Sequence, residues 1–326
     1  MILFTRTMLT LCILIGLALP QAWAEELRTF SFLPQWLPQA QFAGYYMAYE
    51  KGFYKKNGIN LMIMRGGPEH LPTETIAQNR VNFTTMFLSS AIKLRDQGVR
   101  LVNIGQIVQR SGFILVTKKT SGIDSPADLR GKKVSLWTDF RLQPQAFFRK
   151  YGVEVKPVYQ GATMNLFLRG GVAAASAMWY NEYHALLNSG LNEDELRPFF
   201  FDQHGLNFPE DGIYCLEETF RRDANLCRRF VRASLEGWEY AFANPEESLD
   251  VVMRYIRKAN VGANRVHQKW MLARMRDIIL PPGNNTALGR LKRDDYLRVA
   301  GEMKGSGLIK EIPPYGEMYA DCTSRK

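Results

Sequence analysis

RVNFTTMFLSS at residues 80–90 and GVAAASAMWYN at residues 171–181 share one layout of apolar and polar positions. Each predicts a helix and a short turn before a buried strand, then a polar or aromatic loop and a helix that ends near Gly98 or Gly190. Two such α/β units, each with a loop at the carboxyl end of a strand, indicate two lobes with a ligand cleft between them. The alternative is that any two β-α units look alike.

Other short runs rich in β-forming residues alternate with segments of helical periodicity, which indicates an α/β fold. The predicted strands lie at residues 61–63, 83–87, 101–104, 113–118, 134–137, 153–159, 174–179 and 213–216. Two helix starts carry a capping residue followed by proline, at Ser125–Pro126 and Asn244–Pro245.

The composition indicates a folded protein. Of the 326 residues, 46% are hydrophobic and 23% are charged, enough apolar material for a large core. Lys and Arg number 42 against 32 Asp and Glu, a formal net charge of +10. These positive charges are spread along the chain, so we interpret them as a solvated face and expect no nucleic-acid partner.

The first 24 residues have the pattern of a cleaved signal peptide. Arg6 precedes an apolar run at residues 8–19, and Ala22 and Ala24 stand at the −3 and −1 positions of a cleavage site. Pro20 ends the run well short of the length that a membrane span needs. We expect cleavage after Ala24 and export of the remaining chain.

The cysteines and histidines do not identify a definite disulfide or metal site. Only Cys215, Cys227 and Cys322 lie beyond the signal peptide. Cys215 and Cys227 are a candidate disulfide between a strand and a helix, although buried free cysteines are equally compatible with the sequence. The four histidines are scattered, so we expect no metal site.

Three segments resemble a known family. Residues 36–48, WLPQAQFAGYYMA, and residues 121–134 are similar to the segments that begin the two lobes of type II periplasmic solute-binding proteins of ABC importers. WYNEY at residues 179–183 is similar to the thiamine-pyrimidine branch, which includes formylaminopyrimidine-binding proteins and fungal thiamine-pyrimidine synthases. The likeness extends over residues 27–320.

This resemblance implies a periplasmic protein with a two-lobed α/β fold and a hinge crossed twice. Lobe one would comprise residues 25–117 and 210–326, and lobe two residues 118–209. The expected ligand is a thiamine pyrimidine precursor, and the expected partners are an ABC permease and its ATPase. We expect a monomer without a cofactor.

Other functions stay open at this point. The same fold carries sulfonates and other small solutes, and such a protein can also serve a membrane signalling partner. The fungal synthases have a cysteine-rich tract that this chain lacks. We therefore expect no enzyme activity, and no residue is predicted to be catalytic.

A planar aminopyrimidine needs aromatic faces to stack on and an acceptor for its amine. The resemblance implies Trp36 and either Trp179 or Tyr180 as stacking rings, although Trp137 and Trp179 also suit a core. Candidate acceptors are Asn181, Glu182 and Asp139. The remaining candidate ligand-binding residues are Gln41, Tyr45, Phe87, Ser89 and Trp137, with Ser89 also suited to capping a helix.

Overall fold

The computed structural model describes residues 27–283 and 287–323. The signal peptide predicted at residues 1–24 therefore lies outside the described residues. Within the described ranges, no helix combines the length and apolar character that crossing a membrane requires.

The first sheet has five strands in the order β2-β1-β3-β10-β4. They are β2 (Ile59–Ile63), β1 (Arg28–Leu33), β3 (Phe83–Met86), β10 (Gly212–Leu216) and β4 (Leu101–Gln106). β1 runs parallel to both β2 and β3, whereas β10 is antiparallel to β3 and β4. A strand from late in the chain therefore lies inside a sheet built from its beginning.

The second sheet also has five strands, in the order β7-β6-β8-β5-β9. They are β7 (Lys156–Tyr159), β6 (Lys133–Leu136), β8 (Ala174–Met178), β5 (Phe113–Lys118) and β9 (Leu196–Phe200). β9, like β1 of the first sheet, was not among the predicted strands. β9 contains Pro198, which cannot donate to a ladder. Its place at the sheet edge, paired only with β5, accommodates that proline.

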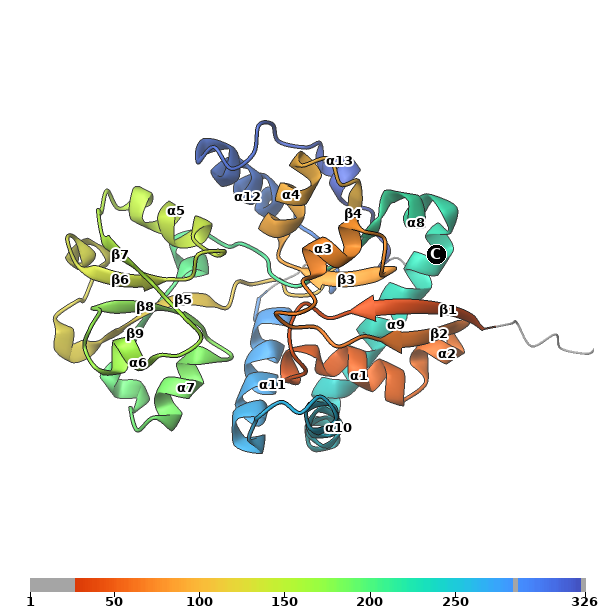
Figure 1. Ribbon diagram of the computed structural model, residues 1–326, viewed down its shortest axis with the longest axis horizontal. Helices are drawn as coiled ribbons and strands as arrows, with labels where there is room; N and C mark the ends of the chain where they lie inside the picture. Colours follow the sequence, from red (N-terminus) through yellow and green to blue (C-terminus); the bar gives the residue numbers. More distant parts are fainter. Residues whose placement is uncertain (1–26, 284–286, 324–326) are drawn as a thin grey trace, which may run out of the picture.

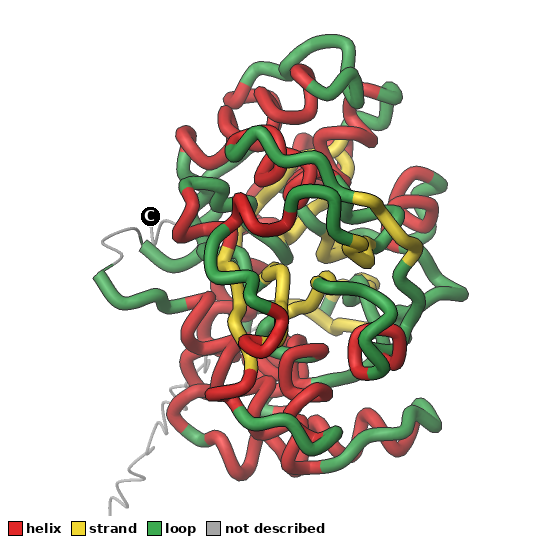
Figure 2. The backbone as a smooth tube through the Cα atoms, turned by 90° about the vertical axis from the view of Figure 1, so that its left-hand side faces the viewer, coloured by secondary structure: helices red, strands yellow, loops and turns green. Residues whose placement is uncertain are grey.

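Each sheet belongs to one lobe, so the predicted two-lobed α/β fold is confirmed (Figure 1). The chain passes between the sheets at residues 107–112 and again at residues 201–211. β5 belongs to the second sheet, so the first boundary lies before β5, not after residue 117 as predicted. In the end-on view of Figure 2 the strands lie inside the molecule, with helices outside them.

Helices cover both faces of each sheet (Figure 1). Lobe one carries α1 (Ala43–Glu50), α2 (Phe53–Lys56), α3 (Pro72–Ala77), α4 (Leu88–Asp96), α8 (Glu217–Arg222), α9 (Ala224–Ala243), α10 (Pro245–Lys258), α11 (Arg265–Ile279), α12 (Arg293–Gly305) and α13 (Tyr315–Met318). Lobe two carries α5 (Leu142–Lys150), α6 (Asn165–Leu168) and α7 (Glu182–Asn188).

The repeated unit predicted from the sequence is present in both lobes. β3 leads into α4 and β8 leads into α7. Gly98 and Gly190 follow these helices with φ of 93° and 97°, a left-handed backbone that glycine adopts without strain. The predicted start at Asn244–Pro245 is confirmed by α10, whereas Ser125–Pro126 opens only a 3-10 turn.

Cys215, Cys227 and Cys322 are buried free thiols. The candidate disulfide between Cys215 and Cys227 is therefore not formed in this structure, although the two side chains adjoin. Hydrogen bonding to the Cys227 thiol, followed by burial, raises the pKa of Cys215. Each cysteine fills the core as a small apolar side chain.

Helices α1 and α9 of lobe one pack closely against each other at two glycines. A Cβ atom on Gly44 would overlap the indole of Trp238, and one on Gly237 would overlap the backbone of Gly44 and the side chain of Ala48. Trp238 is 1% exposed and makes edge contact with Tyr45. These two glycines let α9 approach the helix that follows the first loop of the chain.

We expect Gly237→Ala to lower the free energy of unfolding by about 1–3 kcal/mol, because the added methyl overpacks this crossing. Gly301→Ala on α12 is the matched control, since a Cβ there meets no atom within 4 Å. That control should stabilise the helix by up to about 1 kcal/mol. Urea denaturation measures both variants, and equal effects would refute the tight crossing.

Candidate ligand-binding site at the junction of the two lobes

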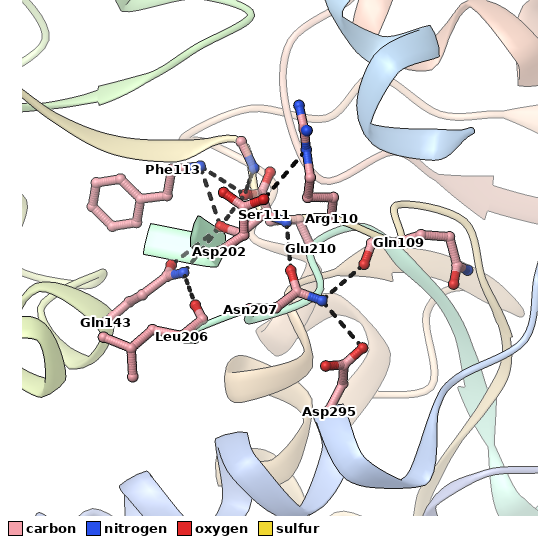
Figure 3. Close-up of polar contacts among 11 residues, drawn as sticks. Gln109, Arg110, Ser111, Phe113, Gln143, Asp202, Leu206, Asn207, Glu210 and Asp295 are labelled. Carbon is pink, nitrogen blue, oxygen red and sulfur yellow. Dashed lines mark hydrogen bonds and ion pairs between the residues drawn. The ribbon is translucent and has the colours of Figure 1, made fainter. Parts of the chain in front are cut away.

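The two chain segments that connect the lobes are hydrogen-bonded to each other through Glu210 (Figure 3). Its Oε1 accepts from Ser111 Oγ at 3.0 Å, from the Gly112 N–H at 2.7 Å and from the Phe113 N–H at 3.2 Å. One oxygen of Glu210, which lies in the second crossing, thus accepts three hydrogen bonds from the end of the first crossing and the start of β5.

Asn207 adds a second link between the crossings and also contacts α12. Its Oδ1 accepts from the Ser111 N–H at 2.8 Å, and its Nδ2 donates to the Gln109 carbonyl at 3.0 Å. The same Nδ2 lies 3.1 Å from Asp295 Oδ2 on α12 (Figure 3). Asn207 therefore connects both crossing segments, which form the hinge, to helix α12 of lobe one.

Asp211 is 2% exposed and receives side chains from the loop after β1. Gln41 Nε2 donates to its Oδ2 at 2.8 Å, and Gln35 Nε2 donates to its Oδ1. Gln35 also contacts Thr85 Oγ1 through its backbone N–H at 3.0 Å. Asp211 thereby fixes the segment that carries Trp36.

Burial raises the pKa of both carboxyl groups, Glu210 and Asp211. Burial, and then the neighbouring charge of Asp211, raises the pKa of Glu210 to about 8, although hydrogen bonds from Ser111, Gly112 and Phe113 oppose this shift. Burial raises the pKa of Asp211 to about 7, opposed by the hydrogen bond from Gln41. Near neutral pH the pair can therefore both donate and accept a proton.

Two tyrosine hydroxyls lie close to this acid pair. The Tyr45 hydroxyl is buried beside the Trp238 side chain, and the Tyr180 hydroxyl faces Glu210. Burial, and then the charge of Asp211, raises the pKa of Tyr45.

The structure brings together three of the predicted site residues, Gln41, Tyr45 and Tyr180, around Glu210 and Asp211. Tyr180 is 3% exposed, and its ring lies against Gly112. Burial, and then the charges of Glu210 and Asp211, raises its pKa. Tyr45 otherwise belongs to the core, where its ring contacts Phe32.

Other predicted residues lie around the edge of the junction. Trp36 is 42% exposed, and Asp139 is exposed. Phe87 of lobe one meets Phe140 of lobe two, their ring centroids 4.8 Å apart, and Phe140 also contacts the half-buried Trp137.

Ser89 lies at the start of α4 but does not cap it. It is half-buried, and the N-cap position belongs to Phe87, without a side-chain hydrogen bond. The capping interpretation of Ser89 is therefore wrong, and a role in ligand binding stays a prediction.

Trp179, Asn181 and Glu182 already have partners within the protein. The Trp179 ring meets Phe200 edge-on and lies near the guanidinium groups of Arg110 and Arg274. Glu182 accepts from the Met178 N–H at 2.9 Å and from Asn181 Nδ2 at 2.7 Å. Their roles in ligand binding stay predictions.

Sequence reasoning missed Glu210 and Asp211. The one signal in the sequence was two adjacent acidic residues followed by Gly212 and the apolar run at residues 213–216. Such a sequence is more simply interpreted as an exposed turn. Their burial depends on partners from distant segments.

The solved structures most useful for comparison have the periplasmic binding protein fold. The aliphatic sulphonate-binding protein of Escherichia coli aligns with a TM-score of 0.70 at 14% identity, covering 91% of this chain and 94% of that chain. The alkanesulfonate-binding protein of Xanthomonas axonopodis, bound to MOPS, aligns with a TM-score of 0.66 at 13% identity, covering 91% and 99%. This similarity establishes the fold.

Residues 39–248 match the family described as "NMT1/THI5 like", and the chain belongs to this family. A riboflavin-binding protein of Chloroflexus aurantiacus is 25% identical, over 70% of this chain and 66% of its own length. A formylaminopyrimidine-binding protein of Halalkalibacterium halodurans is 22% identical, over 72% of this chain and 73% of its own length. The chain thus spans about two thirds of the riboflavin-binding relative.

We expect Glu210→Gln to flatten the pH dependence of stability. Glu210 stays protonated in the folded state up to about pH 8 but ionises near pH 4.3 when unfolded. The folded state therefore binds more protons, and its stability, fully present below about pH 4, is lost as the pH rises through 8. Asp211 remains in the variant, so the dependence should shrink without disappearing.

Urea denaturation between pH 5.5 and 8.5 measures this difference, which should reach at most about 1.4 kcal/mol per pH unit. The substituted amide would keep an oxygen acceptor for Ser111, Gly112 and Phe113. Asp139→Asn, at an exposed carboxylate, is the control and should follow the wild type. Parallel profiles for Glu210→Gln and wild type would show that this carboxyl is not buried as a neutral acid.

Proposed function

We propose that this protein is the solute-binding component of an ABC importer and binds an aminopyrimidine of the thiamine-precursor type between its lobes. The observation that carries the proposal is the buried pair Glu210 and Asp211 at the junction. The exposed Trp36 directly follows Gln35, whose side chain donates to Asp211. Family membership and the two-lobed fold support the class of function.

The acid pair suits the edge of an aminopyrimidine. That edge presents a ring nitrogen, which accepts a hydrogen bond, next to an amine, which donates one. A neutral carboxyl group also offers one donor and one acceptor side by side, and a carboxylate accepts from the amine. Because the pKa of Asp211 is about 7, both forms are accessible near neutral pH.

Trp36 would provide the stacking face. It stands next to Gln35, whose side chain and backbone are held by Asp211 and Thr85. The loop is therefore fixed while the indole stays 42% exposed, which favours stacking with little loss of conformational freedom. Closure over the ligand would then present the closed form to a permease and its ATPase.

A role in binding, without catalysis, fits these residues. The proposal uses hydrogen bonding and stacking, neither of which breaks a covalent bond. The name of the Halalkalibacterium halodurans relative gives formylaminopyrimidine as the ligand of that protein, which supports the same ligand class here.

Riboflavin is a second candidate ligand, favoured by the 25% identical relative that is named a riboflavin-binding protein. The flavin ring also ends in a pyrimidine edge, and its imide N–H could donate to a carboxylate. Sulfonates fit the junction less well, because Glu210 and Asp211 would place carboxyl groups against an anion. Periplasmic location and a monomeric state remain part of the proposal.

We expect hydroxymethyl- or formylaminopyrimidine to raise the melting temperature in a thermal-shift screen. A ligand at 100 times its Kd adds about 2.7 kcal/mol to stability. Thiamine, riboflavin and alkylsulfonates form the comparison set. A shift with riboflavin alone would favour the second candidate, and a shift with sulfonates alone would refute an aminopyrimidine site.

We expect Trp36→Ala to weaken binding of the aminopyrimidine by about 1–3 kcal/mol, because the stacked face is lost. Tyr159→Ala is the matched control, since this aromatic side chain is 71% exposed on the edge strand β7. Isothermal titration calorimetry measures both. Equal affinity of Trp36→Ala and wild type would exclude Trp36 from the site.

A further inference from the structure

Helix α11 of lobe one lies against lobe two through Trp270. Its Nε1–H donates to the Trp179 carbonyl at 3.0 Å, and its ring stacks on His184 of α7 with centroids 4.9 Å apart. Arg274, one turn further along α11, places its guanidinium 4.8 Å from the ring centroids of both Trp179 and Trp270. This contact joins α11 to lobe two next to the first crossing, since the Trp179 N–H donates to the Gly112 carbonyl and the Ile278 carbonyl of α11 accepts from Gln109 and Arg110.

A pair of histidines spans the same interface. His184 Nδ1 on α7 lies 2.9 Å from His267 Nδ1 on α11, so one imidazole must donate to the other. His267 Nε2 lies 2.8 Å from Asn181 Oδ1. The two histidines come from different lobes, and their hydrogen bond exists only while α11 and α7 are in contact.

The neighbouring amide fixes the tautomer of His267. Asn181 Nδ2 donates to the Glu182 carboxylate at 2.7 Å, so Asn181 Oδ1 must be the atom that faces His267. Because that oxygen only accepts, His267 Nε2 carries a hydrogen.

Asn188 Nδ2 also lies 3.2 Å from His184 Nδ1. If His184 Nδ1 accepts from Asn188, His267 Nδ1 must donate to it, and the pair then already carries one positive charge. If His184 Nδ1 instead carries the hydrogen and donates to His267 Nδ1, the Asn188 amide turns its oxygen toward His184.

The hydrogen bond between the two histidines depends on how many protons the pair carries. With one ring charged and the other neutral the bond persists, because a charged imidazole can still donate to a neutral one. A second proton places two N–H groups against each other at 2.9 Å and two positive charges on adjacent rings. The doubly protonated pair therefore repels.

Few charged groups face the pair from the surrounding elements. Glu182 on α7 reaches His267 only through Asn181, and Glu193 faces Tyr183. On α11, Arg274 stacks on Trp270, adding positive charge. Near the start of α11, Arg265 and Lys269 form ion pairs with α10. Arg265 pairs with Glu246 and Asp250, and Lys269 pairs with Glu246.

We propose that His184 and His267 form a proton-sensitive latch that holds the two lobes together at neutral pH and releases them in acid. Burial lowers the pKa of His184, and burial together with the neighbouring His184 lowers the pKa of His267. Separated lobes would return both pKa values toward 6.5, so the open form binds protons more readily. Contact between the lobes is therefore favoured above this value and lost as the pH falls.

Small-angle X-ray scattering of the ligand-free protein tests the latch. We expect the radius of gyration to increase between pH 7.5 and pH 5.0 in the wild type. His184→Asn and His267→Asn keep an amide near the Nδ1 position but do not titrate, so this increase should be absent in both. Circular dichroism at both pH values verifies that each variant is folded.

His204→Gln is the matched control. His204, at the start of the second crossing, contacts Tyr151 at the end of α5 and lies outside the histidine pair, so this variant should keep the wild-type response. A wild-type radius that does not change with pH, or a response that persists in both histidine variants, would overturn the proposal. No ligand is needed, so the outcome is independent of which solute the protein binds.

Discussion

The carboxyl group of Glu210 is the constraint on which the arrangement of the lobes depends. It accepts from three donors at residues 111–113, directly where β5 begins, and it stands two residues before β10. One strand of each sheet, β5 of the second and β10 of the first, thus begins next to the same carboxyl group. Rotation of one lobe against the other must occur around this bonded junction, with Asn207 limiting how far the two segments can separate.

The same junction links the fold to the candidate site. Glu210 holds the hinge while its neighbour Asp211 holds the loop of Gln35 and Gln41. The two acids share one desolvated environment, so charge on Asp211 affects the protonation of Glu210. A ligand that changes the protonation of Asp211 would therefore also act on the carboxyl that connects the lobes.

Local patterns predicted most of the sheet strands and the repeated unit, because periodicity and terminal glycines such as Gly98 reflect short-range physics. β1 and β9 were missed. Pro198 does not by itself explain the omission of β9, because the strand predicted at residues 153–159 contains Pro157 and is present as β7 at the opposite edge of the same sheet. Glu210 was missed because its partners Ser111 and Gly112 lie 99 and 98 residues away. Gln41 and Tyr45 were predicted through family resemblance, but only the structure shows that they face Asp211.

The position of β10 inside the first sheet imposes an order on folding. Residues 113–200 form the whole second sheet from one continuous segment, so it needs no contribution from the rest of the chain. The first sheet instead requires β10 between β3 and β4, and β10 follows all of lobe two. Lobe one must therefore close a long loop before this interior strand pairs, so we expect it to form more slowly than lobe two, with one edge of β3 unpaired and β4 separated from the sheet until β10 arrives.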